Sequence, residues 1–160
     1  MHQQVNWQPI EEHLSRVTGH PFALTGCYSV NGGCIHYAYR IEDTYNKQVY
    51  FIKLNIGDKF EMLRTEAAGL IELAQTGVIR VPVPICWETT PHHTYLVMEA
   101  FTLRSDNFCC DSALGQQLAS LHRTYSNLFG WQQNNYIGST PQINTLSADW
   151  VNFWREQHLH

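Results

Sequence analysis

A pair of glycines separates two strand-like runs of this chain, and a lysine follows about 20 residues later inside a third apolar run. Gly32 and Gly33 lie within YSVNGGCIHYAYRI, whose flanks favour strands, and glycines can take the positive φ angles of a tight hairpin turn. Lys53 lies within YFIKLN, where an ammonium group without a partner is costly to bury. The pattern predicts a hairpin and an anionic partner for Lys53. The alternative is a strand-edge lysine that extends its ammonium group to water.

The hydrophobic periodicity predicts an order of helix, three strands, helix, two strands and two further helices. The ranges are helix 8–18, strands 22–30, 36–42 and 49–55, helix 59–75, strands 81–88 and 94–101, and helices 111–123 and 147–158. This order indicates an α+β fold with an antiparallel five-stranded sheet and one helix inserted after the third strand. That is the layout of the small lobe of kinase-like folds, followed by a hinge and the first helices of the large lobe.

Proline, glycine and serine signals indicate where these elements begin and end. Pro9 suits the first turn of helix 8–18, and Gly19 suits its end. The apolar face of this helix includes Val17. Two prolines in VPVPICWE favour an edge strand, and Ser147 is expected to cap the last helix.

Composition excludes several classes of function. The formal charge of −4 and the absence of a basic tract argue against a nucleic-acid partner. No run reaches the length of a membrane span, and the first residues lack the pattern of a signal peptide, so we expect a cytoplasmic protein without a membrane partner. Five cysteines without a Cys-x-x-Cys pair favour reduced thiols, and the nine histidines lack zinc-ligand spacing, so no metal site is expected.

In a kinase-like small lobe, the glycine hairpin covers the nucleotide phosphates and the lysine of the third strand reaches them. A glutamate on the following helix holds that lysine. Helix 59–75 offers Glu61, Glu66 and Glu72. Glu66 lies on the same helical face as the apolar positions four residues away on either side, and we take it as the partner of Lys53.

Seven runs of the chain together resemble the fructosamine (ketosamine) kinase family, in the right order and over nearly the whole length. The runs are NGGCIHYAYRI, YFIKLN, MLRTEAAGLIELAQTGVIRVPVPI, YLVMEAF, GQQLASLHR, FGWQQNNYIGSTPQIN and DWVNFWREQHL. The MLRTE match also selects Glu66 among the three glutamates. The family is similar in fold to the aminoglycoside phosphotransferases and phosphorylates a sugar hydroxyl of sugars attached to protein amines.

The resemblance implies ATP and Mg²⁺ as cofactors and a ketosamine or other glycated amine as substrate. It implies a small lobe over residues 1–100 and the hinge with the start of the large lobe over residues 101–160. In LVMEAFTL, backbone groups of Glu99, Ala100 and Phe101 are then expected to bind adenine.

The chain departs from the family pattern at its catalytic motifs. The family's His-Gly-Asp-Leu-Trp run and its later Asp-Pro-Ala run do not occur among the 160 residues. Since those acids act on the substrate hydroxyl and hold Mg²⁺, we expect no catalytic residue or magnesium ligand in this chain. We interpret it as the N-terminal portion of a longer kinase, truncated and inactive by itself.

Such a portion is expected to leave apolar helix faces bare and to self-associate through them. Two stripes at helical spacing are candidates, Leu114, Leu118 and Leu121 on one helix and Trp150, Phe153 and Trp154 on the next.

Two further sites are hypotheses. The polar loop FGWQQNNYIGSTPQIN is long for a structureless connection, and its candidates for the sugar side are Trp131, Asn135, Thr140 and Gln142. Cys34 follows the glycine pair directly and either serves as a small strand residue or is a redox-sensitive thiol, since backbone N–H groups and a nearby lysine lower a thiol pKa. A disulfide or a glutathione adduct there would obstruct the nucleotide site.

Alternatives to a fructosamine-type kinase remain. One is a non-catalytic nucleotide-binding or interaction module that pairs with another chain, and another is a phosphotransferase for choline or an antibiotic. The acceptor also stays open among fructosamine, ribulosamine and another ketosamine.

Overall fold

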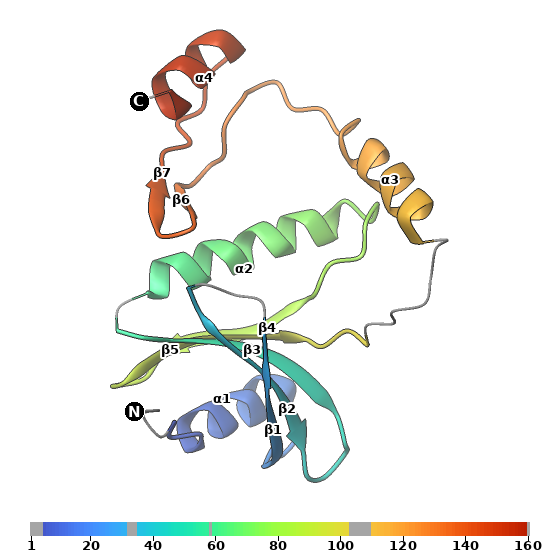
Figure 1. Ribbon diagram of the computed structural model, residues 1–160, viewed down its shortest axis with the longest axis vertical. Coiled ribbons are helices and arrows are strands. Elements are labelled where there is room, and N and C mark those ends of the chain that lie inside the picture. Colours follow the sequence, from blue (N-terminus) through green and yellow to red (C-terminus); the bar gives the residue numbers. More distant parts are fainter. Residues whose placement is uncertain (1–4, 32–34, 58, 103–109, 160) are drawn as a thin grey trace. The chain divides into compact units, whose positions relative to one another are not determined.

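A computed structural model describes residues 5–31, 35–57, 59–102 and 110–159 of the chain (Figure 1). The elements are α1 (Gln8–Thr18), β1 (Leu24–Val30), β2 (Tyr37–Asp43), β3 (Val49–Ile56), α2 (Phe60–Gln75), β4 (Pro84–Thr89), β5 (His93–Glu99), α3 (Cys110–Leu121), β6 (Asn135–Ile137), β7 (Thr140–Gln142) and α4 (Trp150–His158). The chain forms two compact units, Met1–Leu70 with Pro82–Leu103, and Ile71–Val81 with Arg104–His160. The predicted division at residues 100 and 101 stays a prediction.

The first unit contains a five-stranded antiparallel sheet in the order β1-β2-β3-β5-β4. This confirms the predicted meander of three strands, the helix inserted after the third strand, and the edge position of the proline-containing strand β4. β3 is the middle strand of the five, with β2 on one side and β5 on the other. No helix within the described ranges is both long and apolar enough to cross a bilayer.

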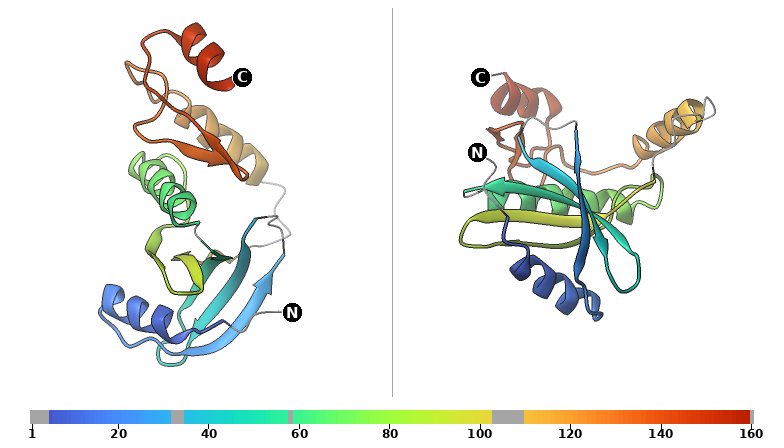
Figure 2. Two further views of the ribbon diagram at one scale, coloured as in Figure 1. Left: turned by 90° about the vertical axis from the view of Figure 1, so that its left-hand side faces the viewer. Right: turned by 60° about the horizontal axis from the view of Figure 1, so that its bottom comes forward.

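The two faces of the sheet carry different cores, because successive side chains of a strand point to opposite faces. Ile52 and Leu54 of β3 pack with Ile10 and Leu14 of α1. On the other face, Leu63 and Ala67 of α2 pack with Leu96 and Met98 of β5. Figure 2 shows α1 and α2 on opposite sides of the sheet. A residue of β3 whose side chain contacts α2 must therefore occupy a position that alternates along the strand with Ile52 and Leu54.

Helix α1 begins and ends as predicted, with proline at its start and Gly19 at its end in the left-handed region at φ 74°. The expectation that Val17 belongs to its buried face is wrong, since Val17 is 48% exposed. It lies in the last turn of the helix, and among the apolar residues of α1 only Ile10 and Leu14 are buried in the sheet core.

The capping prediction for the last helix is also wrong. Helix α4 begins at Trp150, and the N-cap is Asp149, whose Oδ1 accepts the N–H of Asn152 at 3.0 Å. Ser147 instead forms a backbone bridge to Phe129, with N–H groups donating in both directions at 2.8 and 2.9 Å. Serine and aspartate both suit the N-cap position, but the bridge holds Ser147 in extended structure.

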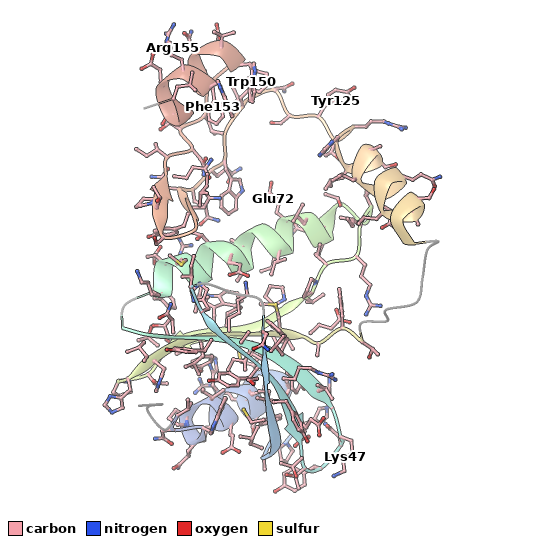
Figure 3. The ribbon with its side chains drawn as sticks, viewed as in Figure 1. Lys47, Glu72, Tyr125, Trp150, Phe153 and Arg155 are labelled. Atoms are coloured by element: carbon pink, nitrogen blue, oxygen red, sulfur yellow. The ribbon has the colours of Figure 1, made fainter. Side chains whose placement is uncertain are left out.

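The predicted apolar stripes are only partly exposed. Leu114 and Leu118 are exposed by 54% and 44%, and Trp150 and Trp154 by 50% and 45%, whereas Phe153 is buried at 7%. The rings of Trp150 and Phe153 lie with centroids 5.9 Å apart (Figure 3). Self-association through these faces stays a prediction.

The connection between β2 and β3 depends on Asp43, which is 1% exposed. Its Oδ1 accepts the backbone N–H groups of Ala23 at 3.1 Å and Tyr45 at 3.3 Å, and its Oδ2 accepts that of Asn46 at 3.3 Å. One carboxylate thus organises a turn and ties it to the segment before β1. Lys47, in the same turn, takes the positive φ of 58°.

Replacement of Asp43 by alanine is expected to lower the free energy of unfolding by about 1–3 kcal/mol, because the N–H of Ala23 loses its acceptor and the turn loses its support. Urea denaturation of the two proteins measures the difference. Glu12→Ala, at an exposed position of α1, is the control and should change stability by less than about 0.5 kcal/mol. Equal effects of the two substitutions would contradict this account.

A second polar contact joins α1 to the sheet. His13 Nδ1 lies 2.6 Å from the hydroxyl of Tyr95, whose side chain is 1% exposed. Burial raises the pKa of Tyr95, so its hydroxyl keeps its proton. Burial also lowers the pKa of His13, and Arg16 lowers it further while Glu88 opposes the shift. The fold therefore favours the neutral imidazole of His13.

Stability is expected to fall as the pH is lowered from about 7 to about 5. The unfolded chain binds a proton on His13 near its ordinary pKa of about 6.5, whereas the folded chain binds it only at lower pH. His13→Gln should remove part of this dependence in urea denaturation across the range. The matched control is His20→Gln at an exposed position, which should leave the slope unchanged. A slope that survives His13→Gln in full would refute the assignment.

Candidate nucleotide site

The central feature of the first unit is an ion pair between β3 and α2. Lys53 Nζ lies 2.5 Å from Glu66 Oε1, and the two side chains are 30% and 29% exposed. The anionic partner predicted for Lys53 is therefore confirmed, and it is the glutamate chosen from the sequence. Glu61 instead pairs with Arg64 at 2.9 Å, and Glu72 accepts the indole N–H of Trp131 at 2.5 Å.

Strand register explains why the pair forms. Lys53 alternates with the buried residues Ile52 and Leu54, so its side chain points to the α2 face. Its cross-strand neighbours there are Ala38 on β2 and Leu96 on β5. Leu96 contributes to the apolar cluster under α2, whereas alanine at position 38 is small. The ammonium group therefore lies at the margin of a core, half-buried, and meets the carboxylate that α2 presents.

The predicted hinge begins where β5 ends. Glu99 is the last residue of β5. Ala100 and Phe101 follow it outside regular secondary structure, and both are half-buried. The N–H of Glu99 donates to the carbonyl of Val83 at 2.9 Å, which ties the start of the predicted hinge to the segment before β4. Lys53 is opposite Leu96 on β5, and Glu99 lies three residues farther along the same strand. The predicted hinge therefore begins roughly 10 Å from the level of Lys53, measured along β5. Base and phosphates of one nucleotide can lie over such a span.

The glycine pair and Cys34 lie outside the described residues, so their roles stay predictions. β1 ends at Val30 and β2 begins at Tyr37, and these strands pair antiparallel from Val30 opposite Ala38. The predicted hairpin between the two runs is therefore confirmed. Its connection is longer than a two-residue turn.

His36, which the sequence analysis does not single out, lies near the ion pair. Its Nδ1 is 3.0 Å from the side-chain amide of Asn55, two residues beyond Lys53 on β3. Burial lowers the pKa of His36, and the charges of Glu66, Lys53 and Lys59 also act on it. Asn55 shares a sheet face with Lys53, which explains why the histidine bonded to Asn55 lies near the pair.

The four candidates for the sugar side belong to the second unit. They lie on or beside a hairpin of β6 and β7 that the sequence interpretation missed, in which Asn135 is opposite Gln142 and Thr140 is opposite Ile137. The turn begins at Gly138 with φ 63°, as expected for a two-residue hairpin turn with glycine first. A Gly-Ser pair between short runs was the available signal.

A buried asparagine, Asn144, organises this hairpin. Its side-chain amide donates to the Gln133 carbonyl at 3.2 Å and to Asn135 Oδ1 at 2.9 Å. The backbone carbonyl of Asn144 accepts the N–H of Trp131 at 3.1 Å, and the residue is 6% exposed. A Cβ on Gly130 would lie 2.8 Å from that carbonyl oxygen, so only glycine fits there. Two of the four candidates, Trp131 and Asn135, thus depend on one residue that the sequence did not single out.

Within the described parts of the chain, no three or more histidine, cysteine, aspartate or glutamate side chains gather in a way that could hold a metal ion.

Comparison with known proteins supplies the family. The family model described as fructosamine kinase matches residues 6–160. The chain belongs to the fructosamine kinase family. It is 41% identical over 154 residues to a protein of Synechocystis sp. named "Probable ketoamine kinase", covering 96% of this chain and 52% of that protein. It is 35% identical over 154 residues to the chloroplastic protein-ribulosamine 3-kinase of Arabidopsis thaliana, covering 94% of this chain and 46% of that enzyme.

Solved structures support the fold. The crystal structure of a Haemophilus somnus 129PT protein named "Putative fructosamine-3-kinase" superposes with a TM-score of 0.85 at 24% identity, over 94% of this chain and 50% of that one. This likeness confirms the kinase-like α+β fold. The fructosamine kinase chain described here spans about half the length of the relatives it matches.

Asn144→Ala is expected to loosen the β6–β7 hairpin, because the Gln133 carbonyl and Asn135 lose a donor. Hydrogen exchange should become faster across residues 129–144 and stay unchanged in α1, which belongs to the other unit. Gln132→Ala, an exposed neighbour outside the network, is the control and should leave exchange as in the original protein. Unchanged exchange in Asn144→Ala would show that the hairpin holds without it.

Proposed function

We propose that this chain forms the nucleotide-binding part of an ATP-dependent kinase that phosphorylates a sugar hydroxyl of a glycated amine. The observation that carries the proposal is the Lys53–Glu66 ion pair on the α2 face of the sheet. In kinase-like folds a lysine on the third strand and a glutamate on the next helix form this pair, and the lysine binds phosphate oxygens. The names of the relatives, a ketoamine kinase and a ribulosamine 3-kinase, support the substrate class.

The proposal gives each residue a role in binding ATP, which supplies the phosphoryl group. Lys53 binds phosphate oxygens and Glu66 holds its ammonium group in place. Backbone N–H groups at Gly32 and Gly33 cover the phosphates. Backbone groups of Glu99, Ala100 and Phe101 bind adenine. All of these residues belong to the first compact unit.

The pair is better explained by ligand binding than by stability. A pair that is about 30% exposed is screened by water and contributes on the order of 1 kcal/mol or less. An apolar pair of similar size would pack there at least as well. A charged pair on a central strand therefore needs another reason, and an anionic ligand provides it.

The remaining parts of the reaction are assigned outside these 160 residues. Mg²⁺ would be bound by the Asp and Asn of family motifs that do not occur in this sequence. Trp131, Asn135, Thr140 and Gln142 are proposed for the sugar side. Cys34 as a redox-sensitive thiol and a cytoplasmic location also stay predictions.

The second candidate function is a non-catalytic nucleotide-binding module. It is favoured by the absence of the His-Gly-Asp run from the sequence. Both candidates require nucleotide binding, and they differ in turnover. The 160-residue chain alone should transfer no detectable phosphate from ATP to a fructosamine, and measurable turnover would refute the assignment of the missing groups.

Lys53→Ala is expected to weaken ATP binding by about tenfold or more, because a charge-assisted contact to phosphate is lost. Isothermal titration calorimetry with ATP and with a non-hydrolysable analogue measures the affinity. The control is Lys47→Ala in the exposed β2–β3 turn, labelled in Figure 3, which removes the same charge and should bind as the original protein does. Equal affinities of the two variants would eliminate the proposed site.

A further inference from the structure

His36 lies on the same face of the sheet as Lys53. The β2–β3 register pairs Ala38 with Lys53 and ends with Tyr37 opposite Leu54, and His36 directly precedes β2. Asn55 and Lys53 are two residues apart on β3 and share one face, which Ala38 shares on β2. The hydrogen bond between Asn55 and His36 is the direct evidence for this placement.

Two backbone groups determine which way the Asn55 amide points. The N–H of Ile56 donates to Asn55 Oδ1 at 2.7 Å, and the carbonyl of Ile35 accepts from Asn55 Nδ2 at 2.9 Å. A backbone N–H can only donate and a backbone carbonyl can only accept, so Nδ2 must be the atom that faces His36. That NH₂ group donates to His36 Nδ1 at 3.0 Å.

This hydrogen bond selects one state of the His36 ring. Nδ1 accepts and therefore carries no proton, so in the neutral imidazole the proton lies on Nε2. Burial lowers the pKa of His36, Glu66 opposes this shift, and Lys53 and Lys59 add to it. At neutral pH, His36 is thus an uncharged donor with a single N–H group.

That N–H group has no acceptor among the residues that the structure describes. Within them, the only hydrogen bond of the His36 ring is the one from Asn55. The ring is half-buried and lies next to the glycine turn in the sequence, on the face that carries the Lys53–Glu66 pair. Lys53 already shares its charge with Glu66, so a triphosphate needs further donors there.

We propose that His36 is an additional phosphate-binding residue, whose Nε2–H donates to a phosphate oxygen of the nucleotide that Lys53 binds. This inference rests on the proposed function. Asn55 acts as its positioning residue, because its amide fixes the ring and the tautomer. The competing account is structural, in which the Asn55–His36 bond only closes the open end of the β2–β3 pair.

Nucleotide affinity distinguishes the two accounts. His36→Leu should weaken the binding of a non-hydrolysable ATP analogue by about tenfold, measured by calorimetry on the 160-residue chain at pH 7.5, roughly one unit above the ordinary histidine pKa. His36→Gln, which keeps an N–H donor, should recover part of the loss. His92→Leu, in the exposed turn between β4 and β5, is the control and should bind normally.

The outcomes separate the inference from the proposed function. If Lys53→Ala loses affinity and His36→Leu does not, His36 is structural and the inference is overturned while the proposed function stands. If the chain binds no nucleotide, the proposed function fails and the inference fails with it.

A second measurement decides the matter if His36→Leu does not fold. Nitrogen-15 spectra of the histidine rings in the original protein should show His36 neutral with the proton on Nε2, and the analogue should shift the Nε2 resonance. A proton on Nδ1, or no shift at saturating analogue, would overturn the inference.

Discussion

The ion pair between Lys53 on the central strand and Glu66 on α2 is the interaction on which the α2 face of the first unit depends. Lys53 lies on β3, with β2 on one side and β5 on the other, and its side chain emerges beside the apolar cluster under α2. An ammonium group there is tolerated only with a partner. Glu66 provides it because Leu63 and Ala67, on nearby turns, pack α2 onto the sheet. The packing of α2 thus brings the carboxylate to the lysine.

The two faces of the sheet differ in chemistry. The α1 face carries a large apolar core, with the His13–Tyr95 hydrogen bond at its margin. The α2 face carries a smaller core beside Lys53, Asn55 and His36. Strand alternation allows both, since each position of β3 serves only one face. A ligand can therefore be bound on one side without disturbing the core of the other.

The second unit depends on a different kind of constraint. Asn144 supplies backbone and side-chain hydrogen bonds to the segment around Trp131 and Asn135, and Gly130 permits its close approach. A buried amide with its partners satisfied specifies one arrangement of a polar loop that has few apolar residues to bury. The hairpin lies within residues 6–160, the region that the fructosamine kinase family model matches.

The sequence by itself determined the order of the elements in the first unit, the antiparallel sheet and the lysine that needs a partner. These follow from apolar periodicity, from glycine and proline positions, and from the cost of burying a charge, all of which act over a few residues. The choice of Glu66 as that partner also used the kinase-like layout and the family resemblance. The tertiary structure decided what depends on longer separations. It joined His36 to Asn55 by a hydrogen bond and paired Glu61 with Arg64 and Glu72 with Trp131. It also placed Ser147 in a backbone bridge, with Asp149 as the cap of α4, and left Val17 exposed. The physical reason is that a side chain's face is set by its own strand or helix, whereas its partner is set by register between segments that only the folded chain brings together.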